Sequence, residues 1–427
     1  MIIIDEQLNI LEKKHAPIRV GLVGAGFAAR GFALQLARGV AGMRLAVIAN
    51  RTLTHAREAY TEAGYTKNIA EVTTPEELQT AVRGEQAVIT SNPDLLCSSP
   101  DIDVVVEATG EVEFGARVIT KAIENKKHVV LINAELDATI GPLLKKKADG
   151  AGVVYTQMDG DQPAVLMNLY RRVAFLGCKP VLAGNIKSLL DHYRTPETQK
   201  EFAEKSFQRP KMITSFADGT KIAMEMATVA NATGFRVGRR GMYGPTAKHP
   251  NDAIDLFSHD EMLNGGLVDY ILGAEPSFGV FVIGYNDNPL FQRYMKVYKM
   301  GDGPFYVFYT PFHLSPLETP ATVARAVLFK DAALAPKGGP VADVIAVAKR
   351  DIKTGEILDG IGGFTCYGLI DNYKTAREKR FLPMGLTDGC KAKRDIKKDE
   401  PISFNDVEMP EDSIACALWQ EQEKIFT

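Results

Sequence analysis

The sequence has 427 residues, which exceeds one ordinary domain and favours two or three. Apolar residues make up 45%, charged residues 24%, and the formal net charge is −3, so no overall positive field attracts nucleic acid or an acidic membrane. The apolar runs are far shorter than the roughly 18 residues that a membrane span needs. The first residues lack the basic start and apolar block of a signal peptide, so we expect a cytoplasmic protein.

A nucleotide-binding motif opens the chain. A strand-like run at 19–23 leads into a glycine turn and then into a helix-like apolar pattern, which together form the GxGxxA motif of a dinucleotide site. The first glycine makes the tight turn, the second lets backbone amides approach a pyrophosphate, and the helix N-terminus adds partial positive charge. The cofactor-binding residues predicted from this motif are Gly24, Gly26, Phe27, Ala28 and Ala29.

A second strand-like run, 45–49, ends at Asn50 and Arg51. A site that prefers NAD usually places Asp or Glu here, to bind the ribose 2′-hydroxyl. This chain has neither, and a guanidinium can pair with a 2′-phosphate. We therefore predict NADP as the cofactor, bound in part by Asn50 and Arg51.

Two more strand-like runs, 102–107 and 128–132, alternate with helix-like segments. This alternation predicts a doubly wound parallel sheet, a Rossmann fold of class α/β, over residues 1–155. Ligands bind at the carboxyl ends of such strands. The polar positions that follow the two strands, and that we expect near the nicotinamide, are Thr109, Gly110, Asn133 and Glu135.

The alternation stops after residue 155, and strand-like segments dominate from 156 to 338. They include 211–230, read as strand, and they predict an α+β substrate domain. A helix-like segment at 317–330 is placed to pack back on the first domain. Polar residues at the ends or interruptions of these segments are candidates for catalysis: Asp161, Lys187, Glu225, Asn231 and His313.

Each candidate also has a structural reading. Asp161 precedes a helix and would cap it, and a lysine after a strand is usually solvated. Within a cleft, Lys187 would instead donate a proton to a carbonyl oxygen or hold a phosphate. Glu225 lies in an apolar run, which puts it on an exposed face or in a cavity with a paired role. The five cysteines are scattered without a Cys-x-x-Cys pair, so neither a disulfide framework nor a metal site is indicated.

A repeated phrase marks the last part of the chain. Residues 348–356 read AKRDIKTGE and residues 392–400 read AKRDIKKDE. Each copy predicts a strand, a turn and a strand, and two copies suggest a pseudo-symmetric pair rather than a solenoid. The alternating charges lie in turns, which is typical of a solvated face. We expect a small β-clip domain at 339–427 that covers the cleft between the first two domains or helps the chain to oligomerise, without supplying catalysis.

The order of motifs resembles the homoserine dehydrogenases, and more closely the DXR-like oxidoreductases with a C-terminal SAF domain. The resemblance runs from about Ile18 to Ile425, and AKRDIKKDEPI (392–402) resembles the SAF motif. The other stretches that carry it are residues 133–135, 139–142, 160–163, 224–234, 241–245, 268–270, 279–282, 303–305 and 311–318. It implies NADPH-dependent reduction, as in a family member that converts 1-deoxy-D-xylulose 5-phosphate to 2-C-methyl-D-erythritol 4-phosphate.

The chain departs from that enzyme's pattern, because Asn185, Thr246 and Thr310 stand where extra basic residues suit a phosphorylated substrate. The leading hypothesis is an NADP-dependent oxidoreductase, a reductase or reductoisomerase, acting on a small polyhydroxylated carbonyl compound such as a ketose phosphate. A divalent metal would assist a reductoisomerisation but is not indicated. Partners are expected to be a small-molecule substrate and further copies of the chain. The alternatives are an NADP-binding sensor or scaffold whose SAF module binds a partner or carbohydrate, and a homoserine-type alcohol dehydrogenase.

In the leading hypothesis the five candidates divide among three roles. Lys187 is the acid/base or oxyanion-stabilising group, Asp161 and Glu225 bind hydroxyls or a divalent ion, and Asn231 and His313 position the substrate.

Overall fold

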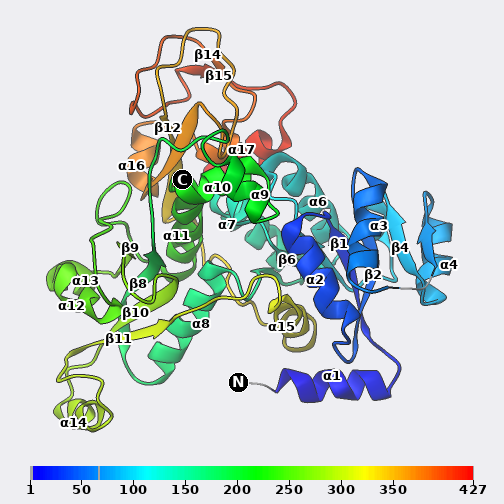
Figure 1. Cartoon of the computed structure of the whole chain (residues 1–427), viewed down its shortest axis with the longest axis horizontal. Coiled ribbons are helices and arrows are strands. Elements are labelled where there is room, and N and C mark those ends of the chain that lie inside the picture. The colour runs from blue at the N-terminus through cyan, green and yellow to red at the C-terminus, as the bar shows by residue number, and fades with distance from the viewer. Residues whose placement is uncertain (1–2, 66–67, 427) are drawn as a thin grey trace.

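The structure, a computed structural model, describes residues 3–65 and 68–426 (Figure 1). The nucleotide part lies on the right of Figure 1, the central part on the left, and the C-terminal part above both. In the described chain no helix is both long enough and apolar enough to cross a membrane.

The first part is a parallel sheet covered by helices. Its strand order is β3-β4-β2-β1-β5-β6-β7, and every pairing is parallel, which confirms the predicted doubly wound sheet. The strands are β1 (Ile18–Val23), β2 (Met43–Ala49), β3 (Ile69–Glu71), β4 (Ala87–Thr90), β5 (Val104–Glu107), β6 (His128–Leu131) and β7 (Tyr155–Gln157). The helices are α1 (Ile4–Lys13), α2 (Phe27–Ala37), α3 (Leu53–Glu62), α4 (Pro75–Arg83), α5 (Pro93–Ser98), α6 (Val112–Glu124) and α7 (Ala134–Ala151).

The second part is built on a mixed sheet of order β11-β10-β8-β9. Its strands are β8 (Lys179–Lys187), β9 (Leu267–Leu272), β10 (Gly279–Tyr285) and β11 (Phe305–Thr310). Its helices include α8 (Gln162–Phe175), α9 (Lys200–Lys205), η1 (Pro250–Asp252), α12 (Ala253–Leu256), α13 (His259–Leu263) and α14 (Pro289–Val297). Strand β8 pairs parallel to β9 and antiparallel to β10, so its carboxyl end, Lys187, emerges beside the end of β9.

The strand prediction for 211–230 is wrong, because the segment forms two helices, α10 (Pro210–Ala217) and α11 (Thr220–Thr233). Thirteen of the fourteen residues of α11 are buried. A helix that is buried on all sides has no exposed polar face to mark a 3.6-residue period, so the pattern did not distinguish it from a strand. The Ala and Met content of the segment favours helix and was the signal to use.

After β11 the chain returns to the first part. Helix α15 (Thr319–Ala324) continues into a π-helical turn, η2 (Arg325–Phe329). Val323 and Ala324 are fully buried in the same core as Phe32 of α2. The Arg325 guanidinium pairs with Asp159, 2.8 Å away, at the end of the nucleotide domain. This return crossing holds the preceding loop, residues 311–318, against α2.

The C-terminal part contains two small antiparallel sheets, β12-β13 and β14-β15. Its elements are β12 (Ala342–Ala348), β13 (Cys366–Asn372), α16 (Tyr373–Glu378), η3 (Met384–Leu386), β14 (Lys391–Ala392), β15 (Val407–Glu408) and α17 (Ile414–Phe426). Sheet β12-β13 lies on α11, and Gly368 of β13 donates its N–H to the Thr220 hydroxyl over 2.8 Å. Helix α17 packs on α6 and α7 of the nucleotide part.

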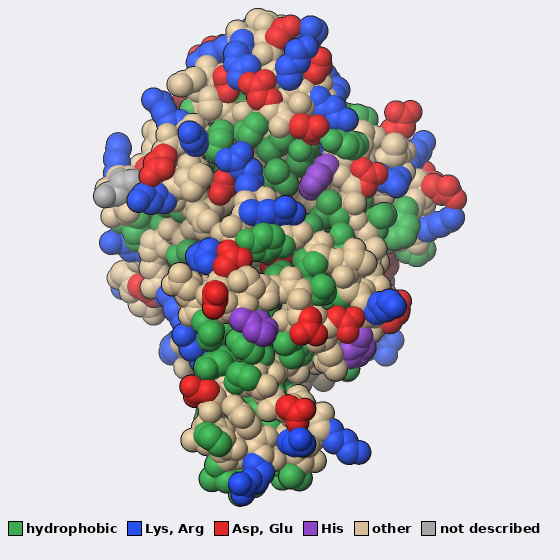
Figure 2. Space-filling view, turned by 90° about the vertical axis from the view of Figure 1, so that its left-hand side faces the viewer, with side chains coloured by type: hydrophobic (Ala, Val, Ile, Leu, Met, Phe, Trp, Pro, Cys, Tyr) green, Lys and Arg blue, Asp and Glu red, His purple; other side chains and the backbone are tan. Residues whose placement is uncertain are grey.

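The two copies of the repeated phrase meet each other in this part. Ile352 and Ile396 exchange both backbone hydrogen bonds at 2.9 Å, and both side chains are fully buried. Around them the ion pairs are reciprocal, because Lys353 contacts Asp395 at 2.8 Å and Lys397 contacts Asp351 at 3.0 Å. Figure 2 shows the mixed basic and acidic side chains at this end of the molecule. The predicted pseudo-symmetric pair is confirmed.

Replacing Gly184 with alanine should destabilise the second part. A Cβ at this β8 position would lie 2.3 Å from the ring of Phe281, which is fully buried on β10. Because the ring must shift within a packed core, we expect G184A to lower the free energy of unfolding by roughly 1–3 kcal/mol, measured by urea titration followed by circular dichroism.

The matched control is G150A on the exposed end of α7, where a Cβ meets nothing within 4 Å. There alanine should raise stability by roughly 0.5–1 kcal/mol, since it restricts the unfolded chain. Equal midpoints for both variants would contradict the close contact between Gly184 and Phe281.

Candidate active site

The glycine turn is shaped to receive a pyrophosphate. Gly24 has a φ of +107°, and a Cβ there would approach the Ala108 carbonyl oxygen to 2.9 Å. Gly26 begins α2 at its N-cap, is exposed, and has open space where a Cβ would project. The first turn of α2 carries no acidic residue. Free amides, a helix dipole and this open space fit a dinucleotide phosphate.

The other members of the predicted cofactor set differ in their exposure. Phe27 is exposed, Ala28 is half-buried, and Ala29 is fully buried against the sheet. Ala29 therefore permits the close approach of helix to strand and does not face a ligand. The Asn50 amide donates to the Thr52 carbonyl over 2.8 Å, whereas Arg51 is exposed and forms no hydrogen bond or ion pair with any described residue. Arg51 is thus the free basic group at the end of β2.

A buried carboxylate organises the strand ends on the other side of the turn. Glu107, at the end of β5, accepts hydrogen bonds from the Asn133 amide and the Thr109 backbone N–H, both at 2.8 Å. The Asn133 side-chain oxygen accepts from the Leu136 N–H at 3.0 Å. Burial raises the pKa of Glu107 despite these donors. Both ends of the Asn133 amide are engaged, so Asn133 braces the loop that carries Thr109 and Gly110.

A group of ionisable side chains from both domains lies near the carboxyl ends of the nucleotide-domain strands. Lys221, in the first turn of α11, donates to Glu135 of α7 over 3.1 Å, and both are buried. Glu225 follows one turn later on α11, so it shares a face with Lys221. The charges of Asp161, Lys187, Lys221 and Glu135 all act on Glu225. The site therefore combines Glu135 of the nucleotide domain with Asp161, Lys187, Lys221 and Glu225 of the central domain.

His313 joins this group from the loop after β11. Its Nδ1 lies 3.1 Å from the Gly160 carbonyl oxygen, and its ring stacks on Phe278 with centroids 4.1 Å apart. The Asp161 charge acts on it, and no side-chain hydrogen bond caps the helix that Asp161 precedes. Asp161 is therefore not engaged as a helix cap and faces the cluster instead. The predicted residues that the structure brings together are Asp161, Lys187, Glu225, His313 and Glu135.

Burial sets the protonation of the group. It raises the pKa of Glu225 to about 8, with the nearby Asp161 charge acting in the same direction. It lowers the pKa of Lys187, with Glu225 opposing the change. For Lys221, burial acts downward, but the charges of Glu135, Asp161 and Glu225 prevail and raise its pKa. Lys187 is therefore the ammonium that gives up its proton more readily, and Lys221 stays charged.

Two buried polar atoms of the cluster have no hydrogen-bond partner, Glu225 Oε2 and His313 Nε2. Burial lowers the pKa of His313, which favours the neutral ring. Buried polar atoms are almost always satisfied, so unpaired ones at a domain junction are suited to a ligand's hydroxyl or carbonyl groups. Within residues 3–65 and 68–426, no three His, Cys, Asp or Glu side chains are grouped to hold a metal ion.

Asn231, on the same helix, makes structural contacts. Its side-chain oxygen accepts the N–H groups of Val341 and Ala342 at 2.7 and 3.1 Å. It lies six residues beyond Glu225, about 9 Å along the helix axis at 1.5 Å per residue. The side-chain oxygen thus anchors the chain entering β12, whereas the amide Nδ2 is buried without a hydrogen-bond partner among the described residues. That Asn231 positions the substrate stays a prediction.

Sequence reasoning missed Lys221 and Glu107. The signal for Lys221 was the Lys-x-x-x-Glu spacing of a helical pair, which was lost when the segment was read as a strand. Asn185, read as a departure from a phosphate contact, is 1% exposed and exchanges two hydrogen bonds with Gln162 at 2.6 and 3.0 Å. Its amide is committed to the protein interior.

Three family profiles match the chain in succession. They are the NAD-binding domain of homoserine dehydrogenase (residues 24–155), the catalytic domain of oxidoreductase DRL (160–319) and the SAF domain (343–408). The chain therefore joins an NAD-binding domain of homoserine dehydrogenase type, a catalytic domain of DRL type and a SAF domain. The matches confirm the predicted resemblance, the Rossmann and SAF assignments, and a nicotinamide dinucleotide as the cofactor.

A homoserine dehydrogenase from Methylobacillus glycogenes is 33% identical over 139 residues, which is 32% of this chain and 30% of that enzyme. The chain thus spans less than a third of the length of the curated relatives it matches. A myo-inositol dehydrogenase from Corynebacterium glutamicum aligns at 14% identity over 64% of this chain and 73% of its own, with a TM-score of 0.38. The 1-deoxy-D-xylulose 5-phosphate reductoisomerase from Zymomonas mobilis aligns at 16% over 50% and 57%, with a TM-score of 0.34. Likenesses of this size do not bear on the substrate.

The raised pKa of Glu225 makes the stability of the DRL-type domain depend on pH. The folded chain keeps a proton that the unfolded chain releases above its ordinary pKa of 4.5, so stability falls as pH rises from there through about 8. The variant E225Q cannot ionise and should avoid this loss. We expect the urea midpoint of E225Q relative to the unaltered chain to increase between about pH 5 and about pH 9.

The control is E204Q on the exposed face of α9, whose midpoint should follow that of the unaltered chain at every pH. A difference between E225Q and the unaltered chain that is constant with pH would contradict a raised pKa at this position.

Proposed function

We propose that the chain is an NADP-dependent oxidoreductase that acts on a small polyhydroxylated compound. It reduces a carbonyl group of that compound to an alcohol, or catalyses the reverse oxidation. The observation that carries the proposal is the convergence of Lys187 with Glu225, Asp161 and His313 beside the dinucleotide edge. A bound nicotinamide supplies or accepts the hydride. The chain's own contribution is to bind the substrate oxygens and to move one proton.

Lys187 is the proposed proton donor to the carbonyl oxygen. Burial lowers its pKa, so the ammonium releases a proton more readily than an exposed lysine, and the same group recovers it for the reverse reaction. Lys221, held at 3.1 Å from Glu135, stays charged and balances the carboxylates around it. This division gives the two lysines separate tasks, proton transfer and charge compensation.

The remaining groups favour hydroxyls as the ligand's binding groups. The Asp161 carboxylate can accept from hydroxyls, the free Glu225 oxygen and the neutral His313 ring can each make one hydrogen bond, and none of these attracts a phosphate. Because Glu225 keeps its proton at neutral pH, the Asp161 and Glu135 carboxylates balance the two ammonium groups, and no excess positive charge is left for a phosphate. An uncharged polyol carbonyl compound therefore fits better than a phosphorylated one. A ketose phosphate remains the second substrate class to test. Homo-oligomerisation and a cytoplasmic location stay predictions.

The role of Lys187 in turnover is tested by measuring NADPH oxidation with a panel of carbonyl compounds. The panel contains polyol-derived aldehydes and ketones, ketose phosphates and amino-alcohol precursors. We expect K187M to lower kcat by roughly 10²- to 10⁴-fold, since it removes the proton donor, while NADPH binding is retained. The matched control is K179M at the exposed opposite end of β8, which should keep full activity.

NADPH binding without turnover on any compound would favour a sensor or scaffold. Full activity in K187M would remove this lysine from the chemistry.

Cofactor choice is tested at Arg51. Loss of a charge-assisted contact to the 2′-phosphate is worth about 1.5–3 kcal/mol, so R51A should bind NADPH roughly 10- to 100-fold more weakly. NADH lacks that phosphate, and its affinity should not change. Fluorescence titration of both cofactors with both proteins gives the comparison, and an equal loss for NADPH and NADH would contradict 2′-phosphate recognition.

A further inference from the structure

One residue breaks the symmetry of the repeated phrase. Lys349, the second residue of the first copy, is 4% exposed, whereas its counterpart in the second copy, Lys393, is exposed. The side chain of Lys393 has no hydrogen bond or ion pair to any residue that the structure describes. A solvated pair of turns was predicted, and that prediction is wrong for Lys349.

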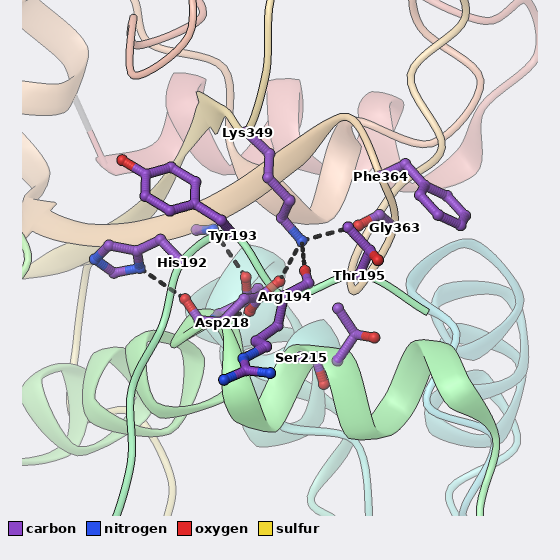
Figure 3. A network of polar contacts seen from close by, with 12 residues as sticks. His192, Tyr193, Arg194, Thr195, Ser215, Asp218, Lys349, Gly363 and Phe364 are labelled. Carbon is purple, nitrogen blue, oxygen red and sulfur yellow. Dashed lines mark hydrogen bonds and ion pairs between the residues drawn. The ribbon is translucent and has the colours of Figure 1, made fainter. Parts of the chain in front are cut away.

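The Lys349 ammonium ends among three acceptors from separate segments. It lies 2.8 Å from Asp218 Oδ2, 2.8 Å from the Arg194 carbonyl oxygen and 2.8 Å from the Gly363 carbonyl oxygen. Figure 3 shows these contacts converging on the Lys349 ammonium. An ammonium has three donors, and all three are used here.

Asp218 transmits this contact to the catalytic helix. Its other carboxylate oxygen, Oδ1, accepts the N–H of Thr220, the first residue of α11, at 2.8 Å. Its backbone oxygen lies 2.7 Å from Nδ1 of His192. Lys221 is the next residue along, and Glu225 lies one turn further. One carboxylate thus links the Lys349 ammonium to the start of the helix that carries both groups.

The contacts of Lys349 with Arg194 and Asp218 also tie together the two ends of a long connection. Residues 188–219 join Lys187, at the end of β8, to the start of α11. Arg194 lies near the beginning of that connection and Asp218 near its end, and Lys349 holds both. Within the connection, the end of the Met212 side chain, on α10, lies against Gly110, where an added Cβ would be 3.2 Å from it. The same segment therefore lies over the loop that follows β5.

We propose that Lys349 of the SAF domain is a positioning residue for the active site, which sets the placement of Lys221 and Glu225 through Asp218. As far as turnover is concerned, this inference rests on the proposed function. Burial of the SAF sheet does not depend on this lysine, because β12 and β13 lie along α11 and Gly368 bonds to Thr220 independently. The repeated phrase therefore contributes to catalysis at one position, without touching substrate.

The test uses the full-length chain and three variants, K349M, K349M/D218N and K393M. The double variant removes both charges together, so no unpaired buried ion is left to unfold the protein, and the asparagine oxygen still accepts from Thr220. It loses the contacts to the carbonyl oxygens of Arg194 and Gly363. Amide hydrogen exchange, NADPH affinity and steady-state kinetics are measured for each protein.

We expect K393M to match the unaltered chain in every measurement. In K349M/D218N, amides in 191–195 and 218–225 should exchange faster while the SAF and nucleotide domains keep their protection. Because Glu225 is proposed to bind a substrate hydroxyl, its misplacement should raise KM and lower kcat by roughly 10- to 100-fold, while NADPH affinity should change by less than about 2-fold.

Unchanged exchange in 218–225 would overturn the inference. Loss of protection throughout the SAF domain would overturn it as well, because Lys349 would then serve folding alone. If the unaltered chain turns over no compound, the proposed function fails, and the exchange measurement still decides whether Lys349 positions α11.

Discussion

The enclosure of α11 by all three parts of the chain is the constraint on which the rest of the site depends. Helix α7 of the nucleotide domain, α8 of the central domain and strands β12 and β13 of the SAF domain all pack against it. Thirteen of its fourteen residues are buried, including Lys221 and Glu225. Charges in so dry a place are stable only when they compensate one another, since removing one partner of a buried pair costs roughly 3–5 kcal/mol. The cluster of opposite charges follows from this enclosure.

The same enclosure gives the groups their chemistry. Burial moves the pKa values of Glu225 and Lys187 towards neutrality, and the carboxylates around Lys221 keep it charged. The SAF domain contributes to this enclosure through β12 and β13, which pack on α11, although most of its charged turns face solvent.

The repeated phrase shows how a symmetric element takes on an unsymmetric task. Gly355 and Asp399 occupy matching turn positions, both with positive φ, and the two isoleucines and the reciprocal ion pairs preserve the symmetry. The strand that precedes the first copy lies on α11, while the second copy has solvent at the matching place. An identical lysine is consequently buried in one copy and exposed in the other, because its surroundings and not its neighbours in sequence differ.

The sequence by itself determined the Rossmann domain, the glycine turn and the β-clip pair, because strands, tight turns and helix starts are set by sterics and periodicity within a few residues. It also placed Lys187, Asp161 and His313 at segment ends, where they do meet. Only the tertiary structure decided that 211–230 is helical, that Lys221 pairs with Glu135, that Asn231 holds a linker and that Lys349 reaches Asp218. Those outcomes depend on which surfaces cover α11, and contacts between residues 86 and 131 positions apart leave no local pattern to read.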